Sequence, residues 1–257
     1  MSRAVLAIGA HPDDIEFLMS GTLMLLGAAG FEMHYLNIAN GSLGTVQYDT
    51  PTIVAMRRNE AAAAAASIGA TFYESVCGDL EFFYDRETLA RVGSVVRQVA
   101  PDIVLTHSPV DYMEDHTNAC RLAVTAAFAR GMPNFVCNPS RPPVMKPMAL
   151  YHAQPYSNHD PLRKLVTPDF YVDITDRVED KVTMLAHHVS QKHWLDESQG
   201  LDSYLQTLRD LDAQVGRMSG RFAYAEGWRQ HLHLGFGAES YDPLREALSS
   251  RITEAQR

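Results

Sequence analysis

The feature that most restricts the fold of this chain is an alternation of short apolar segments and longer helical segments over its first 110 residues. The short segments are apolar or β-branched and lie between loop signals, as strands do: Ala4–Gly9, Met33–Ile38, Thr71–Ser75 and Ile103–Thr106. The segments between them have helical length and composition: Gly21–Ala29, Thr52–Ile68 and Glu87–Val99. Strand, helix and strand in repetition predict a mainly parallel sheet with helices on both faces. We therefore expect an α/β, Rossmann-like three-layer fold.

The second half of the chain has a less regular pattern. Residues 131–168 are rich in proline and indicate long loops around one strand, Ala149–His152. A further strand is expected at Phe170–Ile174, followed by helices at Val178–Gln191 and Leu201–Met218. No internal repeat or clear linker divides the sequence, so we expect one domain over residues 1–257.

Charge and hydropathy exclude several classes of partner. The formal net charge of −9 argues against a surface that neutralises nucleic-acid phosphates or anionic lipids. The apolar N-terminal run is too short for a secretory signal, and no apolar stretch approaches the roughly 20 residues of a spanning helix. We therefore expect a soluble, cytoplasmic protein with no membrane or nucleic-acid partner. Its three cysteines fit neither a disulfide framework nor a metal knuckle.

Two polar clusters follow predicted strands. His11-Pro12-Asp13-Asp14 comes directly after the first strand, and the segment Asp111 to His116 comes after the fourth. Parallel sheets bind ligands beyond the carboxyl ends of their strands. An imidazole and a carboxylate from one loop with an imidazole from the other would form a three-ligand site with one open position, as catalytic zinc requires.

The two adjacent aspartates fit such a site. A catalytic metal lowers the pKa of its bound water to roughly 7 and polarises a carbonyl oxygen. One aspartate could bind the metal while the other acts as general base. Each cluster alone could instead be a turn or a helix cap. Their occurrence together at two loops of one sheet edge favours the metal site.

The clusters resemble the motifs of the PIG-L/LmbE family of metal-dependent N-deacetylases. The first family motif matches Ala7-Ile8-Gly9-Ala10-His11-Pro12-Asp13-Asp14-Ile15-Glu16, followed by Gly21-Thr22, and the second ends in Asp115-His116. The resemblance implies that His11, Asp14 and His116 bind the metal and that Asp13 is the general base. The Gly-x-Gly-x-x-Gly fingerprint is absent after the first strand, so we expect a fold that binds no nucleotide.

Other positions are assigned by the same resemblance. Asp115 is expected to contribute to catalysis by orienting a nearby imidazole. Arg57 matches a family position near the substrate, and Asn40 is in a loop expected to line the pocket. A surface charge on a helix remains the alternative for Arg57, and a turn residue the alternative for Asn40.

One position departs from the family pattern. Many members have His-Pro-Asp-His where this chain has Met113-Glu114-Asp115-His116, and the first histidine of that motif is a candidate general acid. Met113 cannot donate a proton. Either the substrate differs from the usual one, or another donor replaces the histidine near the substrate, with Glu114, His152 and His188 as the candidates.

These observations predict a hydrolase that removes an acyl group, expected to be acetyl, from an N-acylated amino sugar or a related small molecule. Zinc is the expected metal, and two nitrogens with a carboxylate also suit iron(II). Two alternatives stay open: a metal-dependent esterase or amidase for another small molecule, and a non-catalytic sugar-binding relative. A homo-oligomer is compatible with the sequence.

Overall fold

The protein is built on one mixed sheet. A computed structural model describes residues 3–199 and 204–256. Its eight strands have the order β3-β2-β1-β4-β5-β7-β6-β8. The first five in this order are parallel to one another, and β7 is antiparallel to both of its neighbours. The strands are β1 (Arg3–Gly9), β2 (Phe31–Asn37), β3 (Thr71–Tyr73), β4 (Ile103–Thr106), β5 (Ala149–Ala153), β6 (Phe170–Asp173), β7 (Ala225–Gln230) and β8 (Ile252–Glu254).

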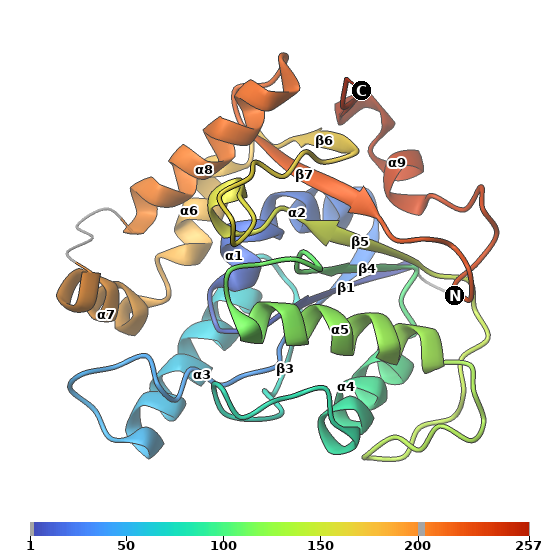
Figure 1. Cartoon of the computed structure of the whole chain (residues 1–257), viewed down its shortest axis with the longest axis horizontal. Coiled ribbons are helices and arrows are strands. Elements are labelled where there is room, and N and C mark those ends of the chain that lie inside the picture. The colour runs from blue at the N-terminus through green and yellow to red at the C-terminus, as the bar shows by residue number, and fades with distance from the viewer. Residues whose placement is uncertain (1–2, 200–203, 257) are drawn as a thin grey trace.

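Helices cover both faces of the sheet, and alternation along β1 shows how the sequence specifies this. Val5 and Ala7 pack into one core, while Leu6 and Ile8 pack into the core on the opposite face. The second core is closed by α4 (Arg86–Val99) and α5 (Glu114–Ala129), which lie in the foreground of Figure 1. The first core is closed by the other helices, which include α1 (Asp14–Leu18), α2 (Ser20–Ala28), α3 (Thr50–Ser67), α6 (Val178–Leu185), α8 (Tyr204–Ser219) and α9 (Pro243–Ala247).

The three-layer α/β fold with a mainly parallel sheet is confirmed. The prediction of one helix over Val178–Gln191 is wrong, because α6 ends at Leu185 and α7 (Val189–Gln199) begins after a break. The break places the fully buried His188 imidazole against Glu16, with Nε2 2.9 Å from Oε1. The predicted start of the next helix, Leu201, lies outside the described residues, and α8 is described from Tyr204.

The strand β7 has no counterpart among the strands expected from the sequence. It contains the buried Glu226, whose carboxylate accepts hydrogen bonds from the backbone N–H groups of Gly21 and Thr22. The same carboxylate lies 2.8 Å from the fully buried Lys181 Nζ, which also contacts Asp212 at 2.9 Å. A charged residue in a central strand is tolerated here because it is fully paired.

In the described part of the chain, no helix has both the length and the apolar character that crossing a membrane requires.

Candidate metal centre and active site

The segments that follow β1 and β4 bring together three side chains of the kind that bind metals. His11 Nδ1 lies 3.3 Å from Asp14 Oδ2, and His116 Nε2 lies 3.3 Å from Asp14 Oδ1. All three residues can direct one ligand atom to a common point. Two ligands at about 2.0–2.1 Å from a tetrahedral zinc ion are about 3.3–3.4 Å apart. The spacing of these donors therefore fits the metal that the two motifs predict.

Each imidazole of this group is held from behind by a carboxylate. His11 Nε2 lies 3.0 Å from Asp115 Oδ2, and His116 Nδ1 lies 3.0 Å from Asp111 Oδ1. Such contacts fix the ring orientation and leave the other nitrogen free for a metal. Asp115 therefore contacts an imidazole as the sequence suggested, and that imidazole is His11. The role of Asp111 was not foreseen, although its place five residues before His116 was the available signal.

The electrostatics of the group favour a cation. Burial would lower the pKa of His11, but hydrogen bonds with Asp115 and Asp14 raise that pKa to about 9. Burial likewise opposes ionisation of His116, and its contacts with Asp14 and Asp111 raise its pKa to about 10. Burial also disfavours the Asp14 carboxylate, yet the neighbouring imidazoles hold its pKa well below the usual range. The carboxylates thus create a negative potential at the point the donors share.

Asp13 is held beside the ligands by a strained backbone. It precedes α1 with φ 114°, in the left-handed region that residues other than glycine rarely adopt. Its Oδ2 accepts a hydrogen bond of 2.7 Å from the Tyr204 hydroxyl. Burial raises the pKa of Asp13 to about 6, although the charge of Arg57 opposes this shift. The pKa of Asp13 therefore lies close to neutral pH, as a general base requires.

The fully buried His107 was also not foreseen as part of the site. It follows β4, and its ring stacks on that of His116 with 4.4 Å between centroids. Its Nε2 accepts a hydrogen bond of 2.9 Å from the Ala10 N–H and lies 3.4 Å from Asp14 Oδ2. Burial lowers the pKa of His107, so the ring supports the site as a neutral imidazole. Its position at the end of a central parallel strand was the signal for it.

A cavity of about 270 Å³ opens over the metal group. Among the predicted site residues, His11, Asp13, Asp14, Arg57, Met113 and His116 line it. The walls are completed by apolar and aromatic side chains with a few polar ones: Phe17, Leu43, Gly44, Asp79, Leu80, Tyr112, Tyr156, Gln191, Trp194 and Leu195.

Arg57 reaches the cavity from α3. Its Nη2 donates a hydrogen bond of 2.7 Å to the Pro12 carbonyl, which fixes the loop that carries Asp13. Gly41 and Gly44 lie directly against its guanidinium group, where a Cβ atom would collide with it. Arg57 is buried, so a solvated helix-surface charge does not describe it.

The other predicted substrate-binding residues are not among the described residues that line the cavity. Asn40 holds a turn, since its Oδ1 accepts from the Ser42 N–H. His152 lies behind the site: its Nδ1 is 2.9 Å from the His107 carbonyl oxygen, and burial lowers its pKa to about 4. His188 is paired with Glu16.

Glu114 is exposed on the first turn of α5 and is likewise absent from the described wall of the cavity. None of the three proton donors suggested in place of the histidine at position 113 therefore faces the cavity.

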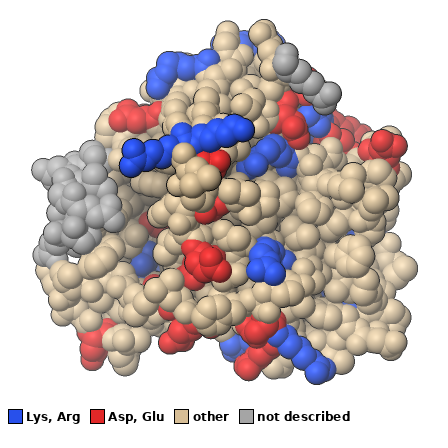
Figure 2. Space-filling model, in the orientation of Figure 1, with Lys and Arg blue, Asp and Glu red and all other residues tan. Residues whose placement is uncertain are grey.

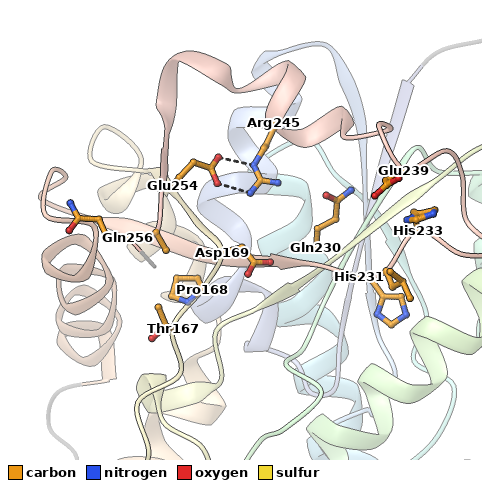
Figure 3. Close-up of a pocket in the computed structure, with 12 residues that line it drawn as sticks. Thr167, Pro168, Asp169, Gln230, His231, His233, Glu239, Arg245, Glu254 and Gln256 are labelled. Atoms are coloured by element: carbon orange, nitrogen blue, oxygen red, sulfur yellow. Dashed lines mark hydrogen bonds and ion pairs between the residues drawn. The ribbon is translucent and has the colours of Figure 1, made fainter.

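A larger hollow of about 760 Å³ lies elsewhere, beside the end of β7 (Figure 3). Its cation Arg245 is paired with Glu254 and Asp242. Its imidazole His231 bonds His152 through Nδ1 at 2.9 Å. Among the described residues, two sets of side chains could hold a metal ion. Both sets include His116, which lines the smaller cavity. The chemistry therefore belongs to the smaller cavity.

An α/β sheet that presents two histidines, two aspartates and an open cavity at its carboxyl edge has the groups that a metal-dependent enzyme requires. The sequence profile described as GlcNAc-PI de-N-acetylase, PIG-L, matches residues 6–128. The chain belongs to this PIG-L family.

The chain is also similar to two curated relatives and to one solved structure. The chain is 31% identical over 236 residues to a diacetylchitobiose deacetylase of Thermococcus kodakarensis, covering 88% of this chain and 82% of the relative. It is 30% identical over 202 residues to a 4-oxalmesaconate hydratase of Pseudomonas putida, covering 74% and 75%. The structure of N,N'-diacetylchitobiose deacetylase from Pyrococcus horikoshii has a TM-score of 0.76 and 25% identity, covering 95% of this chain and 89% of that one.

Proposed function

We propose that this protein is a metal-dependent N-deacetylase that removes the acetyl group from an N-acetylated amino sugar, with zinc as its metal. The observation that carries the proposal is the group of His11, Asp14 and His116 with Asp13 beside it. Deacetylases of acetylated sugars among the relatives support the reaction. Iron(II) is the alternative metal for this donor set.

The protein would contribute a base and a rigid frame. A zinc ion held by His11, Asp14 and His116 would activate water and polarise the amide carbonyl. Asp13 accepts a proton from the attacking water, and Tyr204 fixes the carboxylate for this transfer. The new bond joins the water oxygen to the carbonyl carbon, and the bond from that carbon to nitrogen breaks.

The amine needs a proton as it leaves, and Asp13 is suited to return the one it accepted. Its pKa of about 6 lets the carboxyl group both take up and release a proton near neutral pH. Tyr112 and Tyr156 also line the cavity, but a phenol ordinarily has a pKa of about 10, and burial raises the pKa of Tyr156 to about 12. These phenols therefore serve as hydrogen-bond donors and not as acids. Acetate and the free amine are the products.

Hydration is the second candidate, because one relative is a hydratase whose name denotes a carboxylate substrate. The charges of the cavity favour deacetylation. Of the described residues that line it, Arg57 is the one lysine or arginine, and its charge faces Asp13. Asp13, Asp14 and Asp79 also line the cavity. A substrate with several carboxylates would meet little positive charge from side chains.

The test is turnover by the zinc-loaded protein of N-acetylglucosamine and N,N'-diacetylchitobiose, measured as released acetate and free amine. An O-acetyl sugar of the same skeleton separates an amidase from an esterase. The Asp13→Asn protein is the matched control, because it keeps the metal ligands. Acetate release from the O-acetyl sugar alone, or release that is equal in the Asp13→Asn protein, would refute the proposal.

A further inference from the structure

Three apolar side chains at the mouth of the cavity are unusually exposed. Leu43, Leu80 and Tyr112 line the cavity and are 54%, 54% and 60% exposed. They belong to the loops that follow β2, β3 and β4, so three separate segments contribute to one apolar rim. On a soluble protein, apolar surface gathered around a cavity marks a binding surface.

Leu80 carries two unfavourable features at one position. Its φ of 56° lies in the left-handed region, where asparagine and glycine are favoured and a branched side chain is strained. Its side chain also exposes apolar surface. The backbone requirement is clear, because the Leu80 N–H donates a hydrogen bond of 2.9 Å to Asp115, the carboxylate behind His11. Asparagine would meet that requirement without either cost, so the leucine side chain itself needs another explanation.

The charges at the cavity identify the kind of group that would cover this rim. Arg57 is the one lysine or arginine among the described lining residues, and it lies in the buried part of the cavity beside Pro12 and Asp13. Met113, Tyr156 and Leu195 add apolar surface to the lining, which also includes the polar Asp79 and Gln191. On the face of the molecule that Figure 2 draws, acidic and basic side chains are interspersed with wide uncharged areas, with no field of one sign. An uncharged apolar group matches this lining, and a carboxylate or phosphate does not.

The size of the cavity indicates where that group would lie. A volume of about 270 Å³ lies just below the usual range for small-molecule sites, about 300–1,000 Å³. One sugar ring with its acetyl group would occupy most of it. A further group on the sugar would therefore extend past the walls and meet Leu43, Leu80 and Tyr112.

We propose that the apolar rim of Leu43, Leu80 and Tyr112 binds an uncharged apolar group attached to the amino sugar, outside the amide that is hydrolysed. This inference rests on the proposed deacetylase function. The substrate is then an amphiphilic or aromatic glycoside of an N-acetylated amino sugar, and the free sugar is a poor substrate.

The experiment measures binding separately from turnover. The probes are N-acetylglucosamine and its octyl β-glycoside below its micellar concentration, titrated calorimetrically into zinc-loaded Asp13→Asn protein. We expect the octyl glycoside to bind at least about tenfold more tightly, the effect of burying a leucine-sized apolar surface. In the same background, Leu80→Asn should remove most of that advantage, and Leu43→Ser should do so independently. Met145→Ser is the control, because Met145 is 82% exposed and is not among the described lining residues.

Three results would overturn the proposal. The first is equal affinity for the two probes, and the second is an octyl advantage that survives both rim variants. The third is a Leu80→Asn protein whose assembly mass, measured by sedimentation, changes while its ligand affinity does not. That result would make the rim a contact between copies of the chain. Acetate release from both probes by the zinc-loaded wild-type protein is assayed in parallel. An absence of acetate release with an intact octyl advantage would refute the deacetylase function and leave the apolar group assigned.

Discussion

The Tyr204 hydroxyl in α8 donates a hydrogen bond of 2.7 Å to Oδ2 of Asp13, a residue 191 positions earlier in the sequence. This bond connects the C-terminal part of the fold to the proposed general base. Because it stabilises the ionised carboxylate, it also lowers the pKa of Asp13 against the effect of burial.

Tyr204→Phe should therefore raise the pKa of Asp13. A base must be deprotonated to act, so the acidic limb of the pH–rate profile should move to higher pH, and the rate at pH 6 should fall more than the rate at pH 8. Profiles of kcat/KM for the wild-type and Tyr204→Phe proteins, both zinc-loaded, measure the shift. A profile that only scales down at every pH would contradict this role and indicate a structural one.

Replacing the carboxylates behind the histidines should weaken metal binding without abolishing it. Asp115→Asn and Asp111→Asn each remove the charge opposite one ligand imidazole, and such changes typically cost about 10–100-fold in affinity. Competition with a chromophoric zinc chelator gives the affinities. His11→Ala and His116→Ala should lose the metal almost completely, and stoichiometric zinc in either alanine variant would exclude the ligand set.

The pH dependence of stability should differ between metal-loaded and chelator-treated protein. The pKa values of His11 and His116 are raised from 6.5 to about 9 and about 10. A raised imidazole pKa contributes stability that is fully present below the unfolded pKa and is lost as the pH rises through the folded pKa. Chelator-treated protein should therefore become less stable between about pH 6.5 and pH 10. Zinc-loaded protein should not show this loss, because the metal replaces the protons. Thermal unfolding across that range with and without zinc distinguishes the two.

Lys181→Met should destabilise the fold strongly. Lys181 Nζ lies within 2.9 Å of both Asp212 and Glu226 in the interior, so its removal leaves two buried carboxylates without a counter-charge. Breaking a buried pair typically costs about 3–5 kcal/mol. Urea unfolding at pH 7 measures the loss, and Arg58→Ala, which breaks an exposed pair with Glu74, should stay within about 1 kcal/mol. Comparable losses in the two variants would show that the buried triad adds nothing beyond a surface pair.

The parts of this molecule that sequence could predict are those with a local signature. His11, Asp13 and Asp14 follow β1 directly, and His116 lies near the start of α5, the helix after β4, so strand pattern and motif together locate them. The contact between Tyr204 and Asp13 spans 191 residues, and that between His188 and Glu16 spans 172. Neither has a periodicity or spacing that a sequence would show.

Buried charged residues help to explain why the sequence did not predict β7. Lysine and glutamate are seldom fully buried, so the sequence gives no signal that Lys181 and Glu226 lie in the interior. Their pairing offsets the burial of a charge in β7, and the contact depends on α6, α8 and β7 meeting in three dimensions. Likewise, Glu114, His152 and His188 were chosen as proton donors by residue type, and only the fold shows that none of them is among the described residues that line the cavity.

The replacement of the family histidine by Met113 gives the last prediction. Met113 lines the cavity and none of the three alternative donors does, so Asp13 is left to protonate the leaving amine. Met113→His would add a titratable donor at the cavity wall. General acids typically contribute about 10²–10⁴ in rate, and a donor without evolved neighbours should give less, so we expect a gain of about tenfold on N-acetylglucosamine derivatives. The gain should be small on an activated aryl acetate, whose leaving group needs no proton. Met113→Gln is the matched control, because it has a similar length and cannot act as an acid. An equal gain from the glutamine variant, or an equal gain on both substrates, would mean that the substitution changes binding and that Asp13 already meets the need for a proton donor.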